Sequence, residues 1–176
     1  MNVAIYCGSH EGKRPIYLET AKKLGQALAQ NGHGIVYGGS NIGLMAAMAN
    51  EALTVGAKVI GVMPEHLAKL ERAHKGLTDL HLVDSMHVRK KMMADLADAY
   101  VAMPGGCGTL DEYFEIFTWA QIGLHEKPVI LMNIDGYYDA LLLHFERMIA
   151  DGFVREEHRK ILKVATAVEE LITYLQ

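Results

Sequence analysis

The sequence is poor in residues that mark several common classes of protein. It has 2 cysteines and 4 prolines among 176 residues, and aromatic residues make up 7%. Cys7 and Cys107 form neither a C-x-x-C pair nor a zinc-finger spacing, so we expect two reduced thiols and no metal site. The low aromatic content also argues against a stacking platform for single-stranded nucleic acid.

Basic runs and long apolar runs are absent as well. The chain has 17 Lys and Arg against 21 Asp and Glu, a net charge of -4. A broad positive face for nucleic acid is therefore not expected. No segment reaches the roughly 20 apolar residues of a membrane helix, and the start of the chain lacks the basic segment of a signal peptide. We expect a cytoplasmic protein that binds neither nucleic acid nor membranes.

What the sequence does have is a regular alternation of short apolar runs and amphipathic segments. This alternation predicts an α/β fold, a Rossmann-like doubly wound parallel sheet with helices on both faces. A length of 176 residues and the lack of any linker predict a single domain over 1–176. The polar stretch 65–79 should be a loop or short helix at the rim. Strands are expected at 3–7, 34–37, 58–63, 80–83, 100–103, 129–133 and 161–164, and helices at 16–30, 42–55, 86–97, 109–123, 137–151 and 167–175.

Glycine-rich loops follow three of the expected strands, at the edge where such sheets bind ligands. The first, GSHEGKR (8–14), has three residues rather than four between its glycines, and Arg14 stands where a P-loop needs Ser or Thr. A Walker A site is therefore excluded, while a solvated turn and a ligand-facing loop both stay open. In the second loop, Gly38 and Gly39 would let the backbone approach a ligand, and Ser40 or Asn41 could cap the next helix.

The third loop, PGGCGTLDE (104–112), is the most informative stretch of the sequence. Three glycines in four positions cost backbone entropy that a plain turn does not require. The N–H groups of Gly105, Gly106, Gly108 and Thr109, just before a helix, would form a cradle for an anion. Because the spacing is not G-x-G-x-x-G, a nicotinamide cofactor is not indicated.

Two interpretations of Glu112 stay open. The run TLDE (109–112) matches a capping box, in which Glu112 would bond back to the amide of Thr109. If the glycines instead hold a phosphate, Glu112 lies one turn away and the positive helix end keeps it ionised. It could then accept ribose hydroxyls, orient water or shield an oxocarbenium ion.

A cluster of cations precedes the third loop. Arg89, Lys90 and Lys91 lie at the start of an expected helix, where the helix dipole disfavours positive charge. A bound anion or nearby carboxylates would offset this cost, and the alternative is a solvated basic face.

Two of these stretches carry a family resemblance. PGGCGTLDE fits a PGGxGTxxE signature, and MHVRK (86–90) fits an MHxRK element. Together with YGGSNIGLM (37–45), they resemble the LONELY GUY family, the cytokinin riboside 5'-monophosphate phosphoribohydrolases, many of which are labelled lysine decarboxylase-like. The resemblance implies a homodimer or larger oligomer that needs no cofactor. It also implies hydrolysis of the N-glycosidic bond of a nucleoside 5'-monophosphate, giving adenine or an N6-modified adenine and ribose 5-phosphate.

The resemblance implies two catalytic residues, Arg89 and Glu112. Ser40, Ala46 and His10 differ from the residues that the family usually has at these positions. These three differences concern the shape of the pocket for the sugar and base. A non-catalytic carrier of a nucleotide or cofactor with the same fold remains the alternative, although a carrier does not need the catalytic pair. The residues expected to bind substrate are Gly39, Ser40, Met86, Arg89, Lys90, Gly105, Gly106, Gly108 and Thr109.

Overall fold

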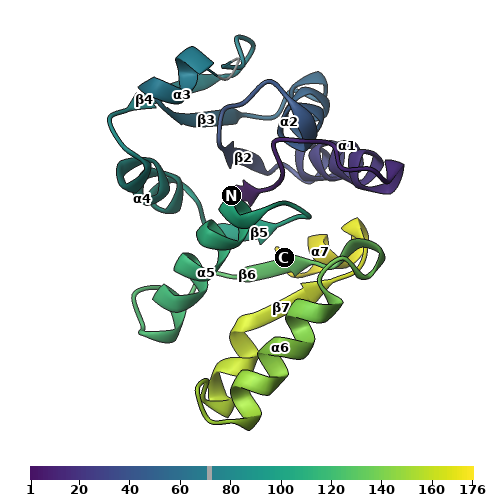
Figure 1. Ribbon diagram of the computed structural model, residues 1–176. Helices are drawn as coiled ribbons and strands as arrows, with labels where there is room; N and C mark the ends of the chain where they lie inside the picture. The colour runs from purple at the N-terminus through teal and green to yellow at the C-terminus, as the bar shows by residue number, and fades with distance from the viewer. Residues whose placement is uncertain (71–72) are drawn as a thin grey trace.

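Parallel strands in the middle of the molecule form one sheet. The structure, a computed structural model, describes residues 1–70 and 73–176. The sheet has 7 strands in the order β4-β3-β2-β1-β5-β6-β7, and all neighbouring strands pair in parallel. They run from β4 at the top to β7 at the bottom of Figure 1. The strands are β1 (Asn2–Tyr6), β2 (Gly34–Tyr37), β3 (Val59–Pro64), β4 (Asp79–Val83), β5 (Ala99–Ala102), β6 (Val129–Met132) and β7 (Leu162–Ala165).

Helices cover both faces of the sheet. On one face α1, α2 and α7 pack against alternate strand side chains such as Val3 and Ile5. On the other face α4, α5 and α6 pack against Ala4 and Tyr6. Both faces are buried, which explains why the inner strands are apolar throughout. The helices are α1 (Pro15–Gln30), α2 (Gly43–Thr54), α3 (Glu65–Leu70), α4 (Met86–Leu96), α5 (Cys107–Gln121), α6 (Asp139–Ala150) and α7 (Val168–Thr173), with 3₁₀ turns η1 (Ile134–Gly136) and η2 (Glu156–Ile161).

The sequence-based prediction of the fold is confirmed, with small shifts at element ends. Strand β2 has the predicted bounds, and α5 begins two residues earlier than expected, at Cys107. The stretch 65–79 begins with the short helix α3, and its residues 71 and 72 lie outside the described residues. The turn η2 was not predicted. None of the helices in the described part of the chain is long and apolar enough to span a membrane.

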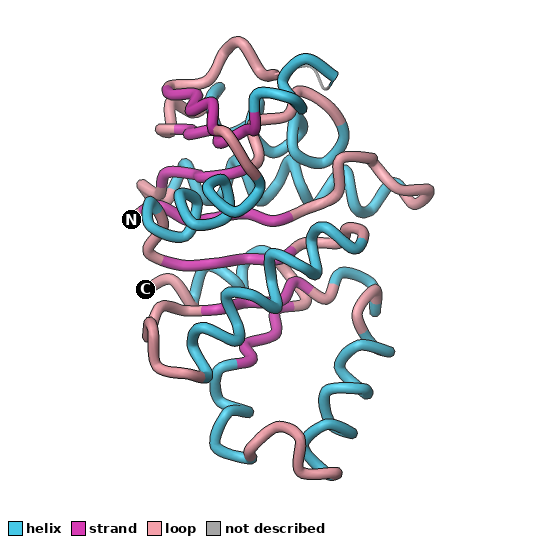
Figure 2. Tube along the Cα trace, turned by 60° about the vertical axis from the view of Figure 1, so that its left-hand side comes forward, coloured by secondary structure: helices cyan, strands magenta, loops and turns pink. Residues whose placement is uncertain are grey.

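The strand order reverses between β1 and β5, and this reversal positions the site. Strands β2, β3 and β4 lie on one side of β1, whereas β5, β6 and β7 lie on the other. The loop after β1 therefore leads to α1 on one face, and the loop after β5 leads to α5 on the opposite face. Diverging loops of this kind leave a crevice at the carboxyl ends of the strands. Figure 2 shows the strands one above another across the view, with both chain ends at the same side.

Candidate functional site

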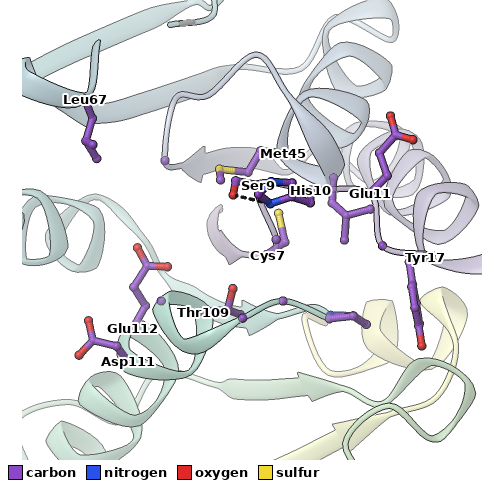
Figure 3. A pocket seen from close by; sticks show the side chains of 18 of the residues that line it. Cys7, Ser9, His10, Glu11, Tyr17, Met45, Leu67, Thr109, Asp111 and Glu112 are labelled. Atoms are coloured by element: carbon purple, nitrogen blue, oxygen red, sulfur yellow. Dashed lines mark hydrogen bonds between the residues drawn. The ribbon is translucent and has the colours of Figure 1, made fainter. Parts of the chain in front are cut away.

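A cavity of about 450 Å³ lies at this reversal of strand order. Side chains from opposite walls face each other across it. Ser9, His10 and Met45 lie on one side in Figure 3, and Thr109 and Glu112 lie on the other. One part of the lining is apolar, which suits a planar base, and the other part is polar. The apolar lining residues are Leu44, Met45, Met63, Leu67 and Met86.

The polar part of the cavity is built on the N-terminus of α5. Gly106 is the N-cap of this helix, and no side chain caps it. The N–H groups from Gly106 to Thr109 donate no hydrogen bond to any residue within 1–70 and 73–176. Unsatisfied N–H groups together with the positive helix end form a seat for an anion. Gly106, Gly108 and Thr109 all line the cavity.

The three glycines of this loop differ in what a side chain at each position would meet. A Cβ at Gly105 would overlap the Oγ1 of Thr109, so packing of the chain itself excludes a side chain there. A Cβ at Gly106 or Gly108 would meet no atom of residues 1–70 and 73–176 within 4 Å, and neither residue has a positive φ. The fold therefore does not require glycine at these two positions, whereas a ligand that approaches the backbone closely would.

Arg89 and Glu112 meet at the edge of the anion seat. Nη1 of Arg89 lies 3.3 Å from Oε1 of Glu112, and the two side chains are 12% and 10% exposed. Nε of Arg89 donates to the carbonyl of Val62 at 3.0 Å, which fixes the guanidinium. A Cβ at Gly38 would overlap Nη2 of Arg89, so the glycine after β2 makes room for this side chain.

Burial controls the ionisation of Glu112. It raises the pKa of the carboxyl group to about 7, although Arg89 acts in the opposite direction. Within the described residues, the buried Oε1 atom has no hydrogen-bond partner, because Arg89 is near but not aligned with it. We expected the helix end to keep Glu112 ionised, and that expectation is wrong. The helix begins at Cys107, so Glu112 lies beyond the first turn, where the dipole acts.

Both capping predictions are wrong. Thr109 lies inside the first turn of α5, so it is not an N-cap and Glu112 is free to face Arg89. The N-cap of α2 is Ile42, without a side-chain hydrogen bond, so neither Ser40 nor Asn41 caps that helix. Ser40 is fully buried, and its Oγ has no partner in the described part of the chain.

The neighbouring cations are paired with carboxylates. Nζ of Lys90 lies 3.1 Å from Asp111 and 3.2 Å from Glu115, and Nζ of Lys91 lies 2.6 Å from Asp95. Carboxylates of α4 and α5 thus offset the cluster of positive charge at the start of α4, which is one of the three explanations that the sequence leaves open. Lys90 ties α4 to α5.

Of the sequence-predicted site residues, the cavity brings together most but not all. Gly39, Ser40 and Lys90 do not line it. Gly39 is needed for a turn with φ of 75°, and Lys90 is held by the carboxylates of α5. The expected site residues that line the cavity are Met86, Arg89, Gly105, Gly106, Gly108, Thr109 and Glu112.

Other lining residues were not assigned from the sequence. Ser9 and His10 belong to the loop after β1, which therefore faces the cavity, while Arg14 at its end pairs with Asp135. The glycines of this loop were the signal that could have identified it. Tyr137 comes from the loop after β6 and had no local signal, because only the fold brings it to the cavity.

Known sequences are similar to this chain over its whole length. A family model described as "Possible lysine decarboxylase" matches residues 45–175. The cytokinin riboside 5'-monophosphate phosphoribohydrolase of Rhodococcoides fascians is 42% identical over 176 residues, which cover 99% of this chain and 89% of that protein. The cytokinin riboside 5'-monophosphate phosphoribohydrolase LOG of Oryza sativa subsp. japonica is 41% identical over 174 residues, covering 99% and 72%.

Solved structures share the architecture at lower identity. The molybdenum cofactor binding protein of Rippkaea orientalis superposes with a TM-score of 0.74 at 23% identity, covering 99% of this chain and 94% of that chain. The Moco carrier protein of Chlamydomonas reinhardtii gives a TM-score of 0.73 at 19% identity, with the same coverage of 99% and 94%. At such identities the likeness establishes the fold and says nothing about the ligand.

Proposed function

Because the chain belongs to the LONELY GUY family, which includes the cytokinin riboside 5'-monophosphate phosphoribohydrolases, we propose that it hydrolyses the N-glycosidic bond of a nucleoside 5'-monophosphate. The proposed substrate is adenosine 5'-monophosphate or an N6-modified derivative. The products are the free base, adenine or a cytokinin, and ribose 5-phosphate. The nucleotide is the expected partner, and we expect the chain to bind neither nucleic acid nor membranes.

The observation that carries this proposal is an anion seat and a buried carboxylate in one cavity. Four N–H groups at the start of α5 have no acceptor among the described residues, and such a group of donors suits a phosphate monoester. Glu112 lies on the same helix and lines the same cavity, and its buried Oε1 faces Arg89 but accepts no hydrogen bond within the described part of the chain. A ribose 5-phosphate unit has the two complementary groups, an anion and hydroxyls.

The reaction follows from this arrangement. We assign Gly106, Gly108 and Thr109 to the phosphate, whose binding energy orients the scissile bond. Glu112 accepts hydrogen bonds from the ribose hydroxyls. It also either stabilises the positive charge that develops at C1' or activates the attacking water. The bond from C1' to the base nitrogen breaks, the bond from water oxygen to C1' forms, and the proton of water ends on the base. Arg89 supplies positive charge to the nucleotide and holds Glu112.

Base release from two nucleotides tests the proposal. The protein is incubated with AMP and with isopentenyladenosine monophosphate, and free base is measured by chromatography. Glu112→Gln should lower kcat by about 100-fold or more, because a carboxylate that assists proton transfer contributes a factor of this order. Glu115→Gln is the matched control, since Glu115 lies one turn further on α5 and does not line the cavity. A loss below tenfold in Glu112→Gln would remove this residue from the chemistry.

Two other functions are less compatible with the cavity. Amino-acid decarboxylation with pyridoxal phosphate needs a lysine for a Schiff base. Among the described residues, no lysine lines the cavity, and the nearby Lys90 is tied to Asp111 and Glu115. A non-catalytic carrier would not need the pair of Arg89 and Glu112. Tight nucleotide binding without base release would favour the carrier.

We also propose that the chain forms a homodimer through the layer of α5 and α6. Four large apolar side chains on α6 or just after α5 and α6 are exposed, and exposed apolar area favours association with a partner. The exposed fractions are 65% for Ile122, 65% for Leu124, 73% for Leu143 and 86% for Phe153.

A cytoplasmic location is proposed from the two free cysteines, since reduced thiols suit a reducing compartment.

A further inference from the structure

Tyr137 holds the backbone of the anion seat from outside the loop. Its hydroxyl donates to the carbonyl of Gly105 at 2.6 Å, and its side chain lines the cavity. The next residue, Tyr138, donates to the carbonyl of Met103 at 2.7 Å. Two consecutive tyrosines of the segment after β6 thus fix two carbonyl groups of the loop that leaves β5.

The hydrogen bond to Gly105 has a consequence for Gly106. The carbonyl of Gly105 and the N–H of Gly106 belong to one planar trans peptide, so they point in opposite directions. Two adjacent glycines would otherwise leave this peptide free to rotate. A hydroxyl that holds the carbonyl therefore fixes the direction of the N–H, and it also polarises the peptide so that the N–H becomes a better donor.

The same segment is joined to the opposite wall of the cavity. The ring of Tyr137 meets the ring of Tyr17 edge-on, with centroids 5.5 Å apart. Asp135 pairs with Arg14 at the end of the loop after β1. Asp135 has φ of 53°, a conformation uncommon for residues other than glycine, so this turn is kept by its surroundings. Residues 135–137 therefore link the two loops that flank the cavity.

We propose that Tyr137 is a positioning residue that orients the phosphate seat of the cavity. This inference rests on the proposed function, because the seat is assigned there to the 5'-phosphate of the substrate. Tyr137 acts through Gly105 and Gly106 and makes no bond to the reacting atoms. Its loss should weaken recognition of the phosphate group and leave recognition of the base unchanged.

The substitution Tyr137→Phe tests this role, since it keeps the ring against Tyr17 and removes only the hydroxyl. We expect the ratio of kcat/KM for AMP to kcat/KM for adenosine to fall about fivefold, the value of one hydrogen bond, through KM rather than kcat. The dissociation constant of ribose 5-phosphate, measured by calorimetry, should rise by a similar factor. Tyr174→Phe is the matched control, because its hydroxyl also donates to a backbone carbonyl, that of Val164 at 3.1 Å, and it does not line the cavity.

The outcomes separate this inference from the proposed function. If Tyr137→Phe keeps both the ratio and the ribose 5-phosphate affinity within twofold of the wild type, the positioning role is overturned. An equal loss in Tyr174→Phe would overturn it too. If the wild type binds ribose 5-phosphate but releases no base from AMP, the proposed function fails, and the affinities of the two variants still decide the role of Tyr137. If ribose 5-phosphate does not bind to the wild type, there is no phosphate seat to position.

Discussion

Glu112 is buried and yet faces a cavity, so its ionisation sets what the site can do at each pH. Burial raises the pKa of its carboxyl group to about 7, and the group is protonated below that value. If the carboxylate is the active form, kcat/KM must rise with pH through this region, because kcat/KM reports the free enzyme. We expect kcat/KM for AMP, measured from pH 5 to pH 9, to rise with an apparent pKa near 7 and then to level off.

The substrate phosphate also titrates in this range, with a pKa of about 6. Binding of ribose 5-phosphate over the same pH range provides the correction, since this ligand has the phosphate but no base. The residual kcat/KM of Glu112→Gln should not show the rise near pH 7. A corrected wild-type profile that stays flat between pH 6 and pH 8 would contradict an ionised Glu112 as the active form.

At the level of elements, the start of α5 combines helix geometry with ligand binding. Gly108 lies in the first turn of this helix, where alanine is more stable than glycine by about 0.5–1 kcal/mol. Its added methyl group would meet no atom of the described residues within 4 Å and would border the cavity. Gly108→Ala should therefore raise the free energy of unfolding in urea by up to that amount, while KM for AMP rises at least fivefold.

Two variants of the same region serve as controls. Thr118→Ala also improves helix propensity on α5 but lies away from the cavity, so it should leave KM unchanged. Gly105→Ala should lose both stability and activity, because its Cβ would overlap the side chain of Thr109. A stabilised Gly108→Ala with the KM of the wild type would mean that no ligand approaches this residue.

The elements themselves could be predicted because their signals are local. Strand β2 and the start of α4 at Met86 followed from apolar runs and spacing alone. The start of α5 could not, because the local match to a capping box at Thr109 competes with a helix that begins at Cys107. The charged ends of Arg89 and Glu112 meet only because α4 and α5 share one face of the sheet.

For the whole molecule, the site depends on contacts between distant parts of the chain. The N–H of Gly8 donates to the carbonyl of Pro104 at 3.1 Å, which joins the loops after β1 and β5. The sequence predicts each of these loops. It does not predict that the loops after β1 and β5 face each other, because that depends on the strand order. For the same reason the sequence pointed to Gly39 beside the cavity, whereas the fold places Gly38 there, against Arg89.

The cavity does not account for the apolar side chains that α6 and the segments after α5 and α6 expose. Leu143 and Phe153 are 73% and 86% exposed, and apolar area of this kind favours association with a second copy. The double variant Leu143→Glu, Phe153→Glu should convert a dimer to a monomer in light scattering after size exclusion, because charges buried in an interface are costly.

Leu82→Glu is the control, since Leu82 is 52% exposed on the edge strand β4, at the far end of the sheet. A wild type that is monomeric at micromolar concentration, or a control that dissociates equally, would contradict a dimer through this layer. A monomeric double variant that still binds ribose 5-phosphate would further mean that one copy holds a complete phosphate seat, as the single chain's cavity predicts.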